Sequence, residues 1–107
     1  MTRTIRSLVT LTLAVSLAGA VGFAQSGGEA TYKAKCAMCH GAQGLAETPA
    51  AKAMKVKPVT DPEVSKMNEA QMVDAVRKGM GKMQPYQDKL TDSQVKDVVT
   101  YFRTFLK

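Results

Sequence analysis

The sequence predicts an all-α fold. Two segments place apolar residues at the three- and four-residue spacing of an amphipathic helix. Each begins at a polar residue that is followed three positions later by glutamine, the pattern of a capping box. The clearer of the two begins with Thr91 and Gln94. The apolar residues that follow at helical spacing are Val95, Val98, Val99, Phe102 and Leu106. No segment alternates apolar and polar residues convincingly, as a half-buried strand would.

The other predicted helices account for most of the remaining chain. One is expected over residues 29–39, between a Gly-Gly pair and Gly41, because glycine commonly marks a helix end. The second capping box, Asn68 with Gln71, opens a helix that should end at Gly79. Residues 41–66 contain two glycines and three prolines, which predicts a loop with at most one short helix, near residues 50–54.

The N-terminus has the pattern of a secretory signal peptide. Arg3 and Arg6 precede an uncharged apolar run over residues 8–20, and small residues follow it. The run is shorter than the roughly 20 residues that a bilayer span needs. We therefore expect residues 1–24 to be removed on export to the periplasm, leaving residues 25–107 as one domain without a retained membrane anchor.

The expected domain is small enough to need help with its core. Removing 24 of the 107 residues leaves 83, with 13 basic and 9 acidic residues and a net charge of +4. Small exported domains usually add disulfides, a metal or a cofactor to a limited core. The chain has only two cysteines, too few for a disulfide scaffold. The composition therefore predicts that something other than disulfides, such as a metal or a cofactor, supplies part of the core.

The run from Cys36 to His40, C-A-M-C-H, has the spacing of a c-type haem attachment motif. In a helix, residues three or four apart share a face, so Cys36, Cys39 and His40 can point the same way. Both thiols can then add to the two haem vinyl groups while the imidazole reaches the iron. The other ring nitrogen is expected to donate to a backbone carbonyl near Thr48 or Pro49, since metal-bound histidines are usually held this way.

Two other interpretations of the cysteine pair were weighed. A thioredoxin-like dithiol requires a strand–helix context, and no β-rich run precedes Cys36. A closed zinc site requires four ligands, whereas the chain has two cysteines and one histidine. An exported C-x-x-C pair without haem would tend to become a disulfide. The sequence therefore favours haem.

A sixth iron ligand must come from elsewhere in the chain. There is no second histidine, and most methionines are expected to fill irregular core gaps. Met80 and Met83 differ from the others because they lie in a glycine-rich loop that is free to approach the iron. The residues alone therefore leave both Met80 and Met83 as candidates for the sixth iron ligand.

Over the expected domain, the sequence resembles the class I c-type cytochromes. The haem motif lies near the start of the domain, and small and aromatic residues occur where the first and last helices of that family cross. These residues are Gly28, Tyr32, Val98 and Tyr101. The stretch over residues 81–86, followed by Leu-Thr-Asp at 90–92, resembles the methionine-ligand loop of the family. Many members have Met-Pro directly, whereas here Gln84 intervenes.

The resemblance implies a small fold of three to four helices around one covalently attached haem c. It implies that Cys36 and Cys39 hold the haem and that His40 and Met83 are the axial iron ligands. Met–His ligation raises the reduction potential of the iron and leaves no open position for a substrate. The implied function is that of a periplasmic electron carrier, not an enzyme. The alternative is an electron-transfer subunit of a larger oxidase or dehydrogenase.

Other classes of function have little support. A peroxidase requires an open iron with an acid–base residue above it, and a sensor requires an output domain for which the chain has no room. Nucleic acid binding is not expected, because aromatic and basic residues do not interleave. Most lysines, Lys57 included, are expected on a solvated face. Lys35 and Lys82 adjoin the proposed ligands and suggest redox partner proteins with an acidic docking face.

Overall fold

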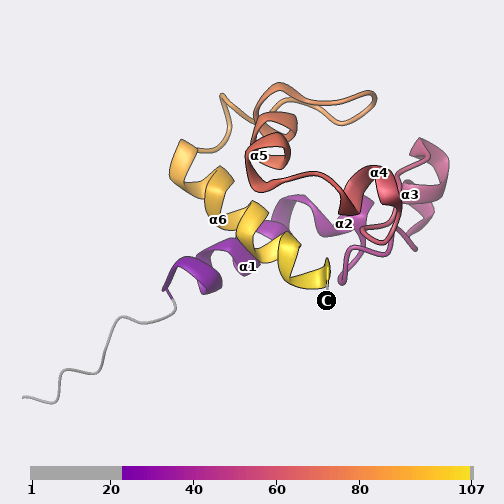
Figure 1. Ribbon diagram of the computed structural model, residues 1–107, viewed down its shortest axis with the longest axis horizontal. Helices are drawn as coiled ribbons and strands as arrows, with labels where there is room; N and C mark the ends of the chain where they lie inside the picture. Colours follow the sequence, from indigo (N-terminus) through magenta and orange to yellow (C-terminus); the bar gives the residue numbers. More distant parts are fainter. Residues whose placement is uncertain (1–22, 107) are drawn as a thin grey trace, which may run out of the picture.

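The computed structural model describes residues 23–106. This part of the chain is helical and contains no strand, which confirms the predicted all-α class (Figure 1). Its elements are α1 (Phe23–Lys35), α2 (Ala37–His40), α3 (Pro49–Met54), α4 (Pro62–Ser65), α5 (Glu69–Lys78), α6 (Asp92–Arg103) and the 3-10 helix η1 (Thr104–Leu106). None of these helices has the length and apolar character required to cross a membrane. All but the last two residues of the expected signal peptide lie outside the described residues.

The crossing of α1 and α6 is the centre of the fold (Figure 1). Gly28 is buried in this crossing, where an added Cβ would lie only 2.3 Å from the carbonyl oxygen of Asp97. One turn further along α1, the ring of Tyr32 lies 5.4 Å from that of Tyr101, measured between centroids. Small and aromatic residues therefore meet at this crossing, as the resemblance implied.

The boundaries of the first helix differ from the prediction. We expected a helix over residues 29–39 that began after the Gly-Gly pair, but α1 begins at Phe23 and contains both glycines. The close approach to α6 requires a residue without a side chain at Gly28, so packing outweighs the tendency of glycine to end a helix. The helix also ends earlier than expected, because a turn at Cys36 separates α1 from α2.

The two predicted capping boxes are confirmed. At the start of α5, Asn68 accepts from the backbone N–H of Gln71, and the Gln71 side chain accepts from the N–H of Asn68. Thr91 and Gln94 make the same reciprocal pair at the start of α6. Both helices therefore begin where the sequence predicted, since the signal depends on residues only three positions apart.

The segment before α5 contains two short helices rather than at most one. The predicted helix near residues 50–54 is α3, but α4 was not expected. It forms because Asp61 accepts from the N–H of Glu63 as an N-cap and because Pro62 occupies the first helical turn, where its missing N–H carries no penalty.

An aromatic cluster joins the helical crossing to the C-terminus. Tyr32 is 1% exposed, and its ring is close to those of Tyr101, Phe102 and Phe105. Its hydroxyl donates to the carbonyl of Gly41 over 2.5 Å. This hydrogen bond ties the helical crossing to the residue that follows the C-A-M-C-H run.

Candidate cofactor site

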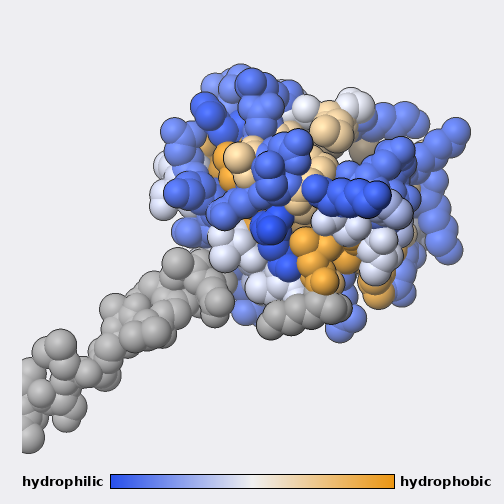
Figure 2. Space-filling model, in the orientation of Figure 1, coloured by the Kyte–Doolittle hydropathy of each residue, from blue (hydrophilic) through white to orange (hydrophobic). Residues whose placement is uncertain are grey.

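An apolar cavity lies between the helical crossing, α5 and the loop that follows α5. About 690 Å³ of empty space lies among its lining atoms, and part of this space is open to solvent. The walls formed by α1, the turn after it, α2 and α6 include Tyr32, Cys36, His40, Val98, Val99 and Phe102. On the face drawn in Figure 2, hydrophobic residues are seen among the hydrophilic ones that surround them.

Of the two motif cysteines, Cys36 lines this cavity and Cys39 does not. Cys36 lies in the turn between α1 and α2 and lines the cavity, and its burial raises the pKa of its thiol to about 11. Cys39 is in α2, with its sulfur 3.9 Å from the sulfur of Met54 in α3. Both thiols are free. The carbonyl of Cys36 accepts from the N–H groups of Cys39 and His40, so one tight turn holds all three motif residues.

His40 contributes a neutral imidazole to the cavity wall. Burial lowers the pKa of the ring, which favours the uncharged form that binds metals. The edge of the ring packs against Phe102 in α6, with 5.5 Å between centroids. The cavity wall therefore offers a neutral imidazole that can bind a metal and, in Cys36, a partly buried thiol.

The expectation that the His40 ring donates to a backbone carbonyl near Thr48 or Pro49 is wrong. Nδ1 is buried and has no hydrogen-bond partner within residues 23–106. Thr48 is the N-cap of α3, and its carbonyl accepts from the N–H of Lys52 over 3.1 Å. Its hydroxyl donates to the carbonyl of Met38 over 2.5 Å. The carbonyl of Thr48 is therefore bonded within α3 and its hydroxyl is bonded to Met38, and neither pairs with the His40 ring.

The loop after α5 brings two thioethers to the cavity. Met80 and Met83 exchange backbone hydrogen bonds of 3.1 and 2.9 Å, and Gly81 makes the turn between them with a φ of +59°. Both side chains line the cavity, but Met80 is 60% exposed whereas Met83 is half-buried. The loop is fixed on its return path, where the N–H of Tyr86 donates to the carbonyl of Val76 over 3.0 Å.

These donors fit haem iron better than an isolated metal ion. The cavity is lined by one imidazole, one partly buried thiol and four thioethers, which belong to Met67, Met72, Met80 and Met83. Within residues 23–106 no three His, Cys, Asp or Glu side chains converge on a point that could hold a metal ion. A large planar cofactor with a central iron can use an imidazole and a thioether that come from separate elements.

The comparison with protein families decides the identity of the fold. Residues 24–102 match the family described as cytochrome C oxidase, cbb3-type, subunit III. The chain belongs to this family of c-type cytochromes. It is an electron-transfer protein with covalently bound haem c, not an enzyme, as the resemblance to class I c-type cytochromes implied. No curated protein matches the sequence.

Several solved structures are similar to this c-type cytochrome. A protein described as KustC0563 c-type cytochrome is 28% identical, with a TM-score of 0.67 over 75% of this chain and 98% of the other. Cytochrome c6 from the diatom Phaeodactylum tricornutum is 22% identical and shares the fold, with a TM-score of 0.58 over 75% and 91% of the two chains. A chain of the Kuenenia stuttgartiensis reducing HAO-like protein complex Kustc0457/Kustc0458 is 18% identical and also shares the fold, with a TM-score of 0.70 over 78% and 44%.

The sequence analysis missed one polar residue of the cavity. Lys57, in the loop between α3 and α4, has the exposed side chain that we expected, but it also lines the cavity. A lone lysine between valine and proline carries no motif, so only the packing of this loop could reveal its position.

Proposed function

We propose that Cys36 and Cys39 of this cytochrome form the thioether bonds to one haem c, and that His40 and Met83 are its axial ligands. We propose further that residues 1–24 are a signal peptide and that residues 25–107 carry single electrons between redox partners in the periplasm. The observation that supports this most directly is the shared cavity. Cys36 and His40 from the motif and Met83 from the loop after α5 all line it.

The residues around the cavity favour a reversible one-electron site. Bound haem iron supplies a redox couple that needs no substrate at the metal. His40 and a thioether are both neutral ligands, so they do not offset the extra positive charge of oxidised iron. An apolar wall makes this charge less favourable still. The neutral ligands and the apolar wall therefore both favour the reduced state. A filled sixth position would exclude peroxide and other ligands, which accords with an electron carrier.

Met83 is supported over Met80 by its burial. A thioether bound to iron must leave solvent, and Met83 is the more buried of the two side chains. An added Cβ at Gly79 would lie 2.7 Å from the carbonyl oxygen of Met83, so a residue without a side chain lets the loop backbone approach α5 at this point.

Membership of a larger complex is the second candidate function. The matched family is described as a subunit of a cbb3-type cytochrome oxidase, and one structure with the same fold is part of an HAO-like protein complex. Native mass measurement on periplasmic extract separates the two: a carrier migrates as a free protein of its own mass, whereas a subunit migrates with its complex.

Absorption spectroscopy of the exported protein tests the ligand assignment. The denatured wild-type protein should retain haem on a gel and show no free thiol. The oxidised protein should show the weak sulfur-to-iron charge-transfer band in the far red. Met83→Ala should abolish this band, lower the reduction potential and open the iron to cyanide or carbon monoxide. Met80→Ala is the matched control and should leave the band intact.

Three outcomes would contradict the proposal. If acid–acetone extracts the haem, the cysteines do not hold it covalently. If Met80→Ala removes the band while Met83→Ala retains it, the ligand is Met80. A wild-type protein that binds carbon monoxide readily and lacks the band would have no methionine ligand, and an enzyme or sensor function would then be favoured.

A further inference from the structure

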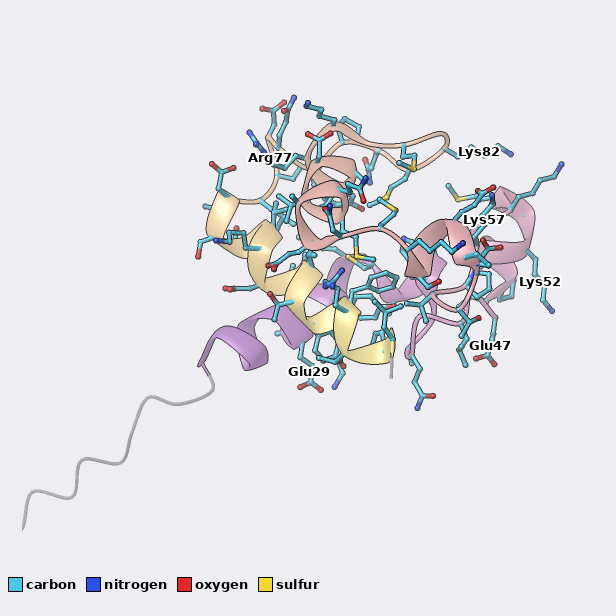
Figure 3. All side chains as sticks on the ribbon, viewed as in Figure 1. Glu29, Glu47, Lys52, Lys57, Arg77 and Lys82 are labelled. Atoms are coloured by element: carbon cyan, nitrogen blue, oxygen red, sulfur yellow. The ribbon has the colours of Figure 1, made fainter. Side chains whose placement is uncertain are left out.

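We propose that Lys57 is the counter-ion of a haem propionate and that Glu63 competes with this propionate for the Lys57 ammonium group. The inference rests on the proposed haem site and adds a residue that sets its reduction potential. The observation behind it is that Lys57, whose side chain is 49% exposed, is the one charged residue among the described residues that line an otherwise apolar cavity. Figure 3 labels Lys57 beside α4.

The cavity and the cofactor are complementary in charge. Within the described residues, the lining side chains are apolar or neutral apart from Lys57, since burial keeps His40 uncharged. A haem carries two carboxylates on its periphery and no other peripheral charge. A carboxylate placed in or beside an apolar cavity is unfavourable unless a cation pairs with it. Among the described lining residues, Lys57 is the one that meets this requirement.

The backbone around Lys57 is fixed before any partner binds. On one side, the N–H of Val56 donates to the carbonyl of Ala51 over 2.9 Å. On the other side, the N–H of Val59 donates to the carbonyl of Gly44 over 2.7 Å, and Val59 is completely buried. The ammonium group therefore moves only through its own side-chain rotations, about an anchored Cα at the cavity.

Lys57 already has an anionic partner in the protein. Its Nζ pairs with the Oε2 of Glu63 in α4, and this contact raises the pKa of Lys57. The side chain of Glu63 is 73% exposed, so water already solvates most of that carboxylate. A propionate that is less accessible to water would gain more from the same cation. The two carboxylates therefore share or exchange one ammonium group.

This arrangement has a consequence for the reduction potential. The propionate is an anion near the iron and favours the oxidised state, whereas a paired cation offsets it and favours the reduced state. A unit charge about 10 Å from a redox centre, at an effective dielectric constant of about 20, shifts the redox equilibrium constant roughly tenfold. For a one-electron couple, a tenfold change corresponds to 59 mV.

Redox titration of charge variants tests the proposal. Lys57→Gln should lower the reduction potential by about 59 mV, which corresponds to a tenfold change in the redox equilibrium constant. Lys57→Arg keeps the positive charge and should have a reduction potential close to that of the wild type. Lys52→Gln is the matched control, because Lys52 is an exposed lysine of the neighbouring helix α3 that does not line the cavity (Figure 3). At 1 M salt, where the screening length is about 3 Å, the effect of Lys57→Gln should persist and that of Lys52→Gln should vanish.

The double variant Lys57→Gln/Glu63→Gln separates a propionate contact from a purely structural ion pair. If Lys57 compensates a propionate, the double variant should retain most of the fall in potential. If Lys57 serves only Glu63, removing both charges should restore the wild-type value, and the proposal is overturned. Equal shifts for Lys57→Gln and Lys52→Gln would also overturn it. Lys57→Met is the second neutral variant if Lys57→Gln yields no mature protein.

The same samples distinguish this inference from the haem assignment. Wild-type protein that lacks covalent haem or the far-red band would refute the proposed site itself. Wild-type protein that has both, with a potential insensitive to Lys57, would refute only the role of Lys57.

Discussion

Gly28 provides the sharpest test of how the two terminal helices form the haem cavity. It lies in α1 where the helix crosses α6, and an added Cβ would meet the Asp97 carbonyl oxygen at 2.3 Å and the carbonyl carbon at 2.8 Å. Ordinary contact with a Cβ begins at 3.4 Å, about 1 Å further out. Because the opposing atoms are backbone, no side-chain rotation relieves the overlap, and Gly28→Ala must push the helices apart.

The expected magnitude follows from two opposing effects. Overpacking of a well-packed contact costs about 1–3 kcal/mol, and a backbone neighbour suggests the upper end. Replacing glycine by alanine within a helix returns about 1 kcal/mol. Gly28→Ala should therefore lower the free energy of unfolding by about 2 kcal/mol.

Gly27 is the matched control because it is the preceding residue of the same helix and has no atom within 4 Å of an added Cβ. Gly27→Ala should raise the free energy of unfolding by up to about 1 kcal/mol through helix propensity alone. The two variants should differ by about 3 kcal/mol, or roughly 12–24 °C in melting temperature for a domain of this size. Denaturation of the haem-loaded protein, followed by circular dichroism, measures both. A Gly28→Ala protein as stable as Gly27→Ala would refute the close crossing.

Two further predictions concern docking and the helical crossing. If lysines near the cavity steer an acidic redox partner, the electron-transfer rate should fall as the salt concentration rises. Lys82→Glu should slow electron transfer more than the control Lys96→Glu, which reverses a charge on α6. Equal slowing by the two variants would contradict this prediction. Tyr32→Phe should lower the free energy of unfolding by about 0.5–1.5 kcal/mol because it removes one of the two donors to the buried Gly41 carbonyl and leaves only the N–H of Gly44. Urea titration measures this, and Tyr86→Phe, whose hydroxyl is exposed, should have a smaller effect; a reversed order would argue against the Tyr32 hydrogen bond.

The sequence predicted the features that depend on nearby residues. The C-A-M-C-H run requires only that Cys36, Cys39 and His40 share a turn, and both capping boxes join residues three positions apart. Such interactions are local, so neither the loops nor the rest of the fold can remove them easily. The family resemblance rested on these signals together with the glycine and aromatic residues of the helical crossing, and the comparisons confirmed it. The assignment of Met83 as an iron ligand stays a prediction.

Tertiary contacts decided the rest. We expected the first helix to begin after the Gly-Gly pair, but α1 contains both glycines. The close crossing with α6 is possible because Gly28 has no side chain. The N-terminus of α3 engages the Thr48 carbonyl that His40 was expected to use. Anchoring of the loop between α3 and α4 through Val59 brings Lys57 to the cavity, where no motif had indicated it. Local sequence determined which helices form and where the haem motif lies. Contacts between residues far apart in the chain determined what surrounds that motif, because burial and charge pairing exist only once the helices have packed.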